Sequence, residues 1–117
     1  MLGAMTDAVS PLVVTCQGDE LLLRLTTAVV DSGLSAALQR GFDAAVRTRP
    51  REARRCRVDV SRVSAMSSSG FEALLLLHGA CRDAGLPLVF SKPTAEFHQL
   101  LSRMGFLRLL RVEGVNV

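Results

Sequence analysis

The sequence predicts one α/β domain with the element order ββαβαβαβ, in which helices pack on a mixed sheet. Its 117 residues fit a single domain that can bury a core without metals or disulfides. Short β-like runs alternate with stretches of helical periodicity, a pattern that favours parallel strands joined by right-handed helical crossovers. We expect the domain to span residues 12–112, between a flexible N-terminal segment, 1–11, and a short C-terminal tail, 113–117.

The first two elements are expected to form a β-hairpin. Residues 12–16 and 20–27 are β-like and apolar, and they flank Gln17-Gly18-Asp19. Glycine and aspartate favour tight reversal of the chain. The composition, with no Trp or Tyr, predicts a core built mainly from Leu, Val and Ala.

A helix is predicted from Asp31 or Ser32, either of which can cap it, to the residues before Pro50. The apolar positions recur at helical spacing and comprise Leu34, Ala37, Leu38, Phe42, Ala45 and Val46. The opposite, polar face is expected to hold Ser35, Gln39, Arg40, Asp43 and Arg47. Proline disfavours α geometry in the residue before it, which predicts the end of this helix.

The second half of the chain repeats the alternation of strand and helix. Residues 56–60 alternate like a strand, and 69–84 form a helix that is apolar over more than one stripe. Residues 86–90 are a compact apolar strand, 94–104 an amphipathic helix, and 106–112 a last strand.

Several functional classes are excluded by composition. Cys16, Cys56 and Cys81 form no CxxC pair, which predicts buried free thiols in a reducing compartment, with no disulfide and no metal site. The longest nearly uncharged stretch, 66–80, is too short to cross a bilayer, and the N-terminus lacks the features of a secretory signal. We therefore expect a cytoplasmic protein that does not insert into membranes.

The net charge of +3 is carried by arginine, because Lys92 is the only lysine. Six arginines lie between Arg47 and Arg57. Such a cluster can contact nucleic acid or an acidic partner. It has no interleaved aromatic residue and no nucleic-acid-binding motif, so a solvated loop without a nucleic-acid partner is the preferred interpretation.

A serine run, Ser67-Ser68-Ser69-Gly70, stands at the predicted start of the second helix. Free amides and the positive end of the helix dipole favour a hydroxyl cap there, or an anion such as phosphate. In one interpretation Ser67 or Ser68 is only the cap. In the other, phosphorylation of Ser68 adds a charge that local amides tolerate and a partner shaped for a neutral hydroxyl does not.

Catalysis by these serines is disfavoured, because no base is available. His78 lies ten residues along the same helix from Ser68, roughly 15 Å away at about 1.5 Å per residue. His98 falls on the third helix with only Glu96 as an acidic neighbour. Phosphate-binding, dinucleotide-binding and metal motifs are absent from the sequence. We expect a protein that is not an enzyme and that needs no cofactor.

The strand Val58-Asp59-Val60-Ser61 and the following Ser67-Ser68-Ser69-Gly70-Phe71 resemble a STAS domain, the module of bacterial anti-sigma factor antagonists and sulfate transporter tails. The resemblance covers residues 12–112, with the same order of elements. In the family the turn reads Asp-Ser-Ser-Gly, and Ser67 stands in place of the aspartate. Ala28-Val29-Val30-Asp31 likewise replaces Gly-Glu-Leu-Asp and keeps only Asp31.

This resemblance implies a protein that regulates transcription by binding an anti-sigma factor. In the family, this anti-sigma factor is also the kinase that phosphorylates the antagonist on a serine. The resemblance implies phosphorylation at Ser68, and partner contacts at Asp31, Ser67, Ser68, Ser69, Gly70 and Phe71. Two alternatives remain. The chain is an accessory subunit of a lipid-transporting ABC system and binds the ATPase with the same face, or it is a constitutive antagonist or stress-complex scaffold that is not phosphorylated.

Overall fold

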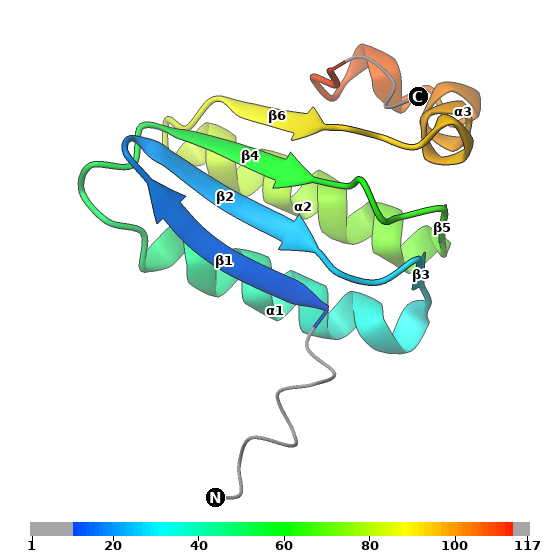
Figure 1. Cartoon of the computed structure of the whole chain (residues 1–117), viewed down its shortest axis with the longest axis horizontal. Helices are drawn as coiled ribbons and strands as arrows, with labels where there is room; N and C mark the ends of the chain where they lie inside the picture. The colour runs from blue at the N-terminus through cyan, green and yellow to red at the C-terminus, as the bar shows by residue number, and fades with distance from the viewer. Residues whose placement is uncertain (1–10, 114–117) are drawn as a thin grey trace, which may run out of the picture.

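A computed structural model describes residues 11–113 and confirms the predicted fold class (Figure 1). Four strands form the main sheet in the order β1-β2-β4-β6. They are β1 (Leu12–Gln17), β2 (Glu20–Leu25), β4 (Arg55–Asp59) and β6 (Leu88–Ser91). β1 runs antiparallel to β2, and β2, β4 and β6 are parallel to one another. The expected segment 1–11 lies outside the described residues except for Pro11, as does the tail beyond Glu113.

Two long helices cover one face of this sheet. Figure 1 shows α1 (Ser32–Arg47) and α2 (Ser68–Asp83) side by side behind the strands, and the two helices pack against each other. Alternate residues of the central strands point toward them and are buried, as in Leu21, Leu23 and Leu25 of β2. No described helix is long and apolar enough to span a membrane.

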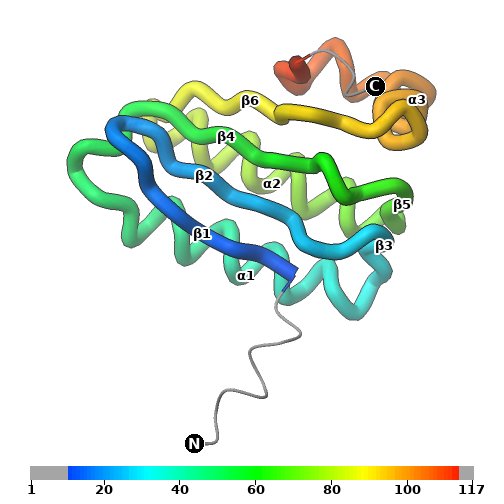
Figure 2. The backbone as a smooth tube through the Cα atoms, in the orientation of Figure 1, coloured from blue at the N-terminus to red at the C-terminus, as the bar shows by residue number. Residues whose placement is uncertain are grey.

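A second, two-stranded sheet lies where the main strands end. β3 (Val29–Val30) and β5 (Ala65–Met66) pair in parallel, and Figure 2 shows them side by side next to the start of both long helices. The Ser67 N–H donates to the carbonyl of Val30 over 2.8 Å. This pairing, which sequence patterning did not predict, fixes the serine run against the start of α1.

The last part of the chain differs from the sequence prediction. After α3 (Ala95–Arg103), residues 106–112 do not form a strand; Phe106–Arg108 form a 3₁₀ helix. Gly105 makes this turn possible with a φ of 76°, and the Phe106 ring packs 5.3 Å from Phe71. Only Val112 keeps a β-bridge, to Phe90. Phe106 and Leu107 therefore pack against the core from a helical turn, and Leu110 is buried just after it.

Burial corrects two further expectations. Cys16 is exposed because β1 is an edge strand, whereas Cys56 and Cys81 are buried. Ser35 was expected on the polar face of α1 but is only 4% exposed, because it precedes Leu38 by three residues and shares its face.

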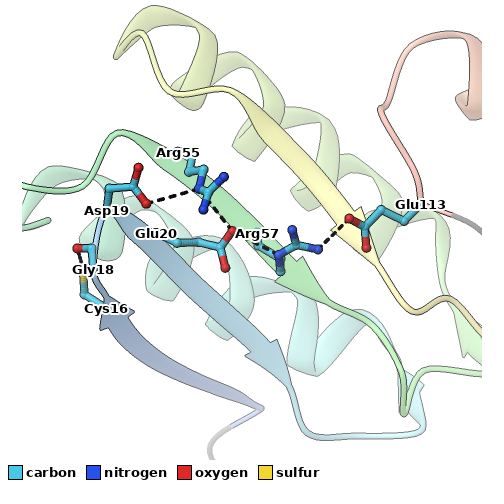
Figure 3. Close-up of polar contacts among 7 residues, drawn as sticks. All are labelled: Cys16, Gly18, Asp19, Glu20, Arg55, Arg57 and Glu113. Atoms are coloured by element: carbon cyan, nitrogen blue, oxygen red, sulfur yellow. Dashed lines mark hydrogen bonds and ion pairs between the residues drawn. The ribbon is translucent and has the colours of Figure 1, made fainter.

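The arginine cluster is not all solvated loop. Arg55 and Arg57 belong to β4, and Figure 3 shows them on the face of the sheet opposite the helices, in a chain of ion pairs. Glu20 contacts Arg55 at 3.5 Å and Arg57 at 3.1 Å, and Arg57 also reaches Glu113 at 2.8 Å. This network links β2 and β4 to Glu113, which the predicted domain boundary left in the tail.

Candidate functional site

The serine turn, which we define as Ser67–Ser68–Ser69–Gly70, starts helix α2, and Ser67 is its N-cap. The Ser67 backbone is extended, with φ −73° and ψ 167°, and its Oγ accepts a hydrogen bond from the Gly70 N–H at 3.3 Å. Ser68 is the first helical residue. Its side chain is exposed, and its hydroxyl makes no hydrogen bond with any residue between 11 and 113. Of the two capping candidates, the structure therefore selects Ser67 and leaves Ser68 open to solvent.

Three hydroxyls, those of Ser35, Ser67 and Ser69, meet beneath the turn, and we call them the hydroxyl triangle. The Ser67 and Ser69 oxygens lie 3.0 Å apart, and Ser69 Oγ donates to Ser35 Oγ at 3.1 Å. Ser35 Oγ is also 3.5 Å from Ser67 Oγ. The hydroxyls on either side of Ser68 are thus occupied by one another, and the Ser68 hydroxyl is the one that the turn presents.

Asp31 marks the start of α1 at the same pole of the molecule. Its Oδ1 accepts from the Leu34 N–H at 2.9 Å, which makes Asp31 rather than Ser32 the N-cap. Its carbonyl accepts from Ser35 Oγ at 2.8 Å. The first turns of α1 and α2, neither of which contains an acidic residue, are therefore tied together through the hydroxyl triangle. Two positive helix ends converge there, an arrangement that favours a negative group.

Gly70 and Phe71 lie behind the turn and do not face outward. A Cβ on Gly70 would come within 3.0 Å of Met66 Sδ and 3.2 Å of Val30 Cγ1, so the glycine allows α2 to approach β3 and β5. Phe71 is 4% exposed and stacks on Phe97 with ring centroids 6.0 Å apart. Of the six residues expected to contact a partner, these two hold the turn in place through the core.

Sequence analysis missed two residues of this pole, Ser35 and Val29. The signal for Ser35 was available, because a serine interrupts the apolar stripe of the first helix four residues after its cap. Val29 is more than half exposed and directly precedes Val30, whose carbonyl accepts the Ser67 N–H. An exposed valine in a two-residue strand has no sequence signature.

Neither histidine is placed as a base for the serine turn. His78 lies ten residues beyond Ser68 in α2, and His98 belongs to α3; neither bonds to a serine among the described residues. Within residues 11–113, no group of three or more His, Cys, Asp or Glu side chains is arranged to hold a metal ion. The chemistry of the site is that of exposed hydroxyl, exposed carboxylate and helix ends.

Solved structures with similar folds include anti-sigma factor antagonists. One, from Mycobacterium paratuberculosis, is 14% identical, with 89% of this chain and 85% of that chain covered and a TM-score of 0.72. SpoIIAA in its unphosphorylated form is 13% identical, with 89% and 88% covered and a TM-score of 0.66, and Bacillus SpoIIAA was also solved in the phosphorylated form. At these identities the likeness concerns the fold.

A transport protein shares the fold as well. A sulfate transporter family protein from Wolinella succinogenes is 19% identical, with 84% of this chain and 79% of that chain covered and a TM-score of 0.70. No curated protein sequence matches this chain. The model of the family described as "Mlab, STAS domain" matches residues 12–111, nearly the whole of the described fold. The chain therefore belongs to the STAS domain family.

Proposed function

We propose that this protein is a cytoplasmic anti-sigma factor antagonist that acts by binding, not by catalysis, and that it docks on an anti-sigma factor with serine kinase activity. The observation that carries the proposal is the state of Ser68. Its hydroxyl is exposed and unbonded among residues 11–113 at the first position of α2, while Ser67 and Ser69 are held in the hydroxyl triangle. The contact surface comprises this turn, the exposed carboxylate of Asp31 and the exposed side chain of Val29.

The same geometry supports a phosphorylation switch. A phosphate on Ser68 adds a charge of about −1.5 to −2, which the free amides of the first turn and the helix dipole stabilise. No core group is disturbed, because the Ser68 side chain points to solvent. The fold therefore tolerates the modified serine. A partner surface that packs against a neutral hydroxyl loses that contact and gains an unpaired charge, so binding weakens.

Binding to the purified anti-sigma kinase of the same organism, measured by calorimetry, tests the switch. We expect Ser68→Glu to weaken binding at least tenfold, a cost of about 1.4 kcal/mol. Ser68→Gln is the matched control, because glutamine has nearly the same size as glutamate but no charge. We expect it to lose much less affinity. Equal affinities for wild type and Ser68→Glu would refute the switch, and no binding by the wild type would refute the function.

Incubation with the same kinase and ATP tests the acceptor. The mass should rise by about 80 Da, the mass of one added phosphoryl group, in the wild type and in Ser69→Ala, and not in Ser68→Ala. Ser67→Asp, which restores the aspartate usual in the family, should raise the rate because a carboxylate beside Ser68 can orient its hydroxyl. Binding without any mass change would identify a constitutive, unphosphorylated antagonist instead.

The likeness to a sulfate transporter family protein favours one further candidate, a subunit of a transport system. In that function the serine turn and Asp31 bind the ATPase of an ABC transporter for lipids, and Ser68 needs no modification. Copurification from the native host separates the two functions. An anti-sigma kinase bound in a Ser68-dependent way supports the first, and an ABC ATPase supports the second.

A further inference from the structure

Strand β1 is an open edge of the main sheet (Figure 1). It pairs with β2 on one side, and no segment within residues 11–113 pairs with it on the other. Its sequence, LVVTCQ, has no charged residue and no proline, and Val13 and Val14 are 42% and 45% exposed. Natural edge strands usually carry charges, prolines or bulges that block further pairing. β1 has none of these protections.

The hairpin determines which backbone groups of β1 face outward. The Thr26 N–H donates to the carbonyl of Pro11 at 3.0 Å, so residues 11 and 26 form a hydrogen-bonded pair. In an antiparallel ladder such pairs recur at every second residue, so odd-numbered residues of β1 bond to β2. The N–H and C=O groups of Val14 and Cys16 therefore point away from the sheet, ready for another strand.

The opposite edge of the sheet, strand β6, is partly covered by the chain itself. There the Phe90 N–H donates to the Arg111 carbonyl at 2.9 Å, and the Glu113 N–H donates to the Phe90 carbonyl at 2.9 Å. The chain thus covers β6 with its own C-terminal residues. The described chain therefore occupies the outward groups of Phe90 in β6, whereas no described residue bonds to the outward groups of Val14 and Cys16 in β1.

We propose that β1 pairs antiparallel with β1 of a second copy of this chain across a twofold axis. Each copy then offers the same uncharged edge to the other, so no like charges meet across the contact. Because the outward groups belong to even-numbered residues, only even residues can bond to each other. The bonded pair at the centre of the contact is Val14 with Val14, Val14 with Cys16, or Cys16 with Cys16. The twofold axis then passes at Val14, Thr15 or Cys16, respectively.

Each of these registers keeps the two subunits in the same orientation. Even-numbered residues of β1 share the face of Leu21, Leu23 and Leu25, which is the helix-covered face. Pairing even residues with even residues places the helices of both copies on one side of a continuous sheet. The second copy thus adds its four strands to the four of the first without burying either helical layer.

The contact predicts a weak, concentration-dependent dimer with a functional consequence. One pair of edge strands buries less than the roughly 1,200 Å² of a stable interface, so we expect a dissociation constant in the micromolar range or above. The serine turn belongs to α2 and not to β1, so both copies keep it accessible. The dimer is bivalent toward any partner of that turn, which raises apparent affinity for a dimeric or clustered partner.

Light scattering and sedimentation of the full chain, from about 5 to about 500 µM, cover the range expected for such a contact. The mass should rise from 12.6 kDa toward twice that value. Val14→Lys places like charges at the contact, and Val14→Pro removes an outward N–H without removing a bond to β2; both should remain monomeric at all concentrations. Leu109→Lys, at a similarly exposed residue outside the sheet, is the matched control and should dimerise normally.

A nitroxide on Cys16 identifies the surface, because the other two cysteines are buried. In all three registers the two labelled residues lie within about 15 Å, given a rise of about 3.4 Å per residue. The spectrum should therefore broaden with concentration in the wild type and stay sharp in Val14→Pro. A wild type that is monomeric at every concentration overturns the proposal. So does a dimer that shows no broadening, or one that persists in both Val14 variants.

Discussion

Gly70→Ala tests the idea that close packing beneath the serine turn positions the site. An added Cβ meets the Met66 side chain, with Sδ at 3.0 Å, and Val30 Cγ1 at 3.2 Å. Val30 is fully buried, so it cannot move away freely. Overpacking of this kind costs about 1–3 kcal/mol, while replacing glycine by alanine in a helix gains up to about 1 kcal/mol. We expect a net loss of up to about 2 kcal/mol, together with weaker partner binding.

Gly79→Ala is the matched control in the same helix. Apart from the chain neighbours and the backbone of its own helix, the nearest atom to its added Cβ is Arg82 Nη2 at 3.9 Å, so only the helix gain remains. A gain of about 1 kcal/mol corresponds to a rise in Tm of about 4–8 °C for a domain of this size. The two variants differ in the contact and not in the substitution, so the gap between their free energies of unfolding, about 1–3 kcal/mol, measures the cost of the clash.

Urea denaturation followed by circular dichroism gives both free energies of unfolding, and calorimetry with the partner gives the effect on binding. Gly79→Ala should bind as the wild type does, since it lies away from the turn. Equal and positive shifts for the two variants would show that the turn has room to spare and that our account of Gly70 is wrong.

Three further outcomes are expected. Ser35→Ala, which opens the hydroxyl triangle, should cost about 1 kcal/mol in urea denaturation, and Ser35→Thr less; an unchanged stability would contradict the role of the triangle. The pKa of Asp59 is lowered, since burial opposes ionisation but the hydroxyl and N–H of Ser61 and nearby cations outweigh it. Because the Asp59 pKa is lower in the folded than in the unfolded protein, ionised Asp59 stabilises the fold at neutral pH, and this stabilisation is lost as the pH falls below about 4. The free energy of unfolding of the wild type should therefore approach that of Asp59→Asn at low pH. A difference between the two that stays constant with pH would refute this. Cys16 should react with Ellman's reagent at once and Cys56 only on unfolding, because the neighbouring thiol and burial raise the Cys56 pKa.

Local patterns in the sequence were sufficient for most of the fold. The helical periodicity of residues 34–46 and the proline at 50 predicted α1, and the turn at Gly18 predicted the hairpin, where a φ of 59° suits its first central residue. The fold class follows from these elements because alternating strands and helices leave few ways to bury their apolar faces.

Local patterns failed where a contact between distant residues decides the conformation. Residues 106–112 are apolar enough for a strand, but Phe106 packs against Phe71, and the 3₁₀ turn places its ring there. β3 and β5 are too short to show a period of two, and they exist because Val30 and Met66 lie in register beside the serine turn.

The candidate site also combines features that local sequence determines with features that depend on tertiary structure. The sequence by itself determined that a serine run starts the second helix, because caps and helix starts depend on residues within one turn of each other. Tertiary structure alone decided which serine is free. Ser35, 32 residues before Ser67, completes a triangle that holds Ser67 and Ser69 and leaves Ser68 exposed. That choice depends on the packing of α1 against α2, which brings together hydroxyls that no local pattern relates.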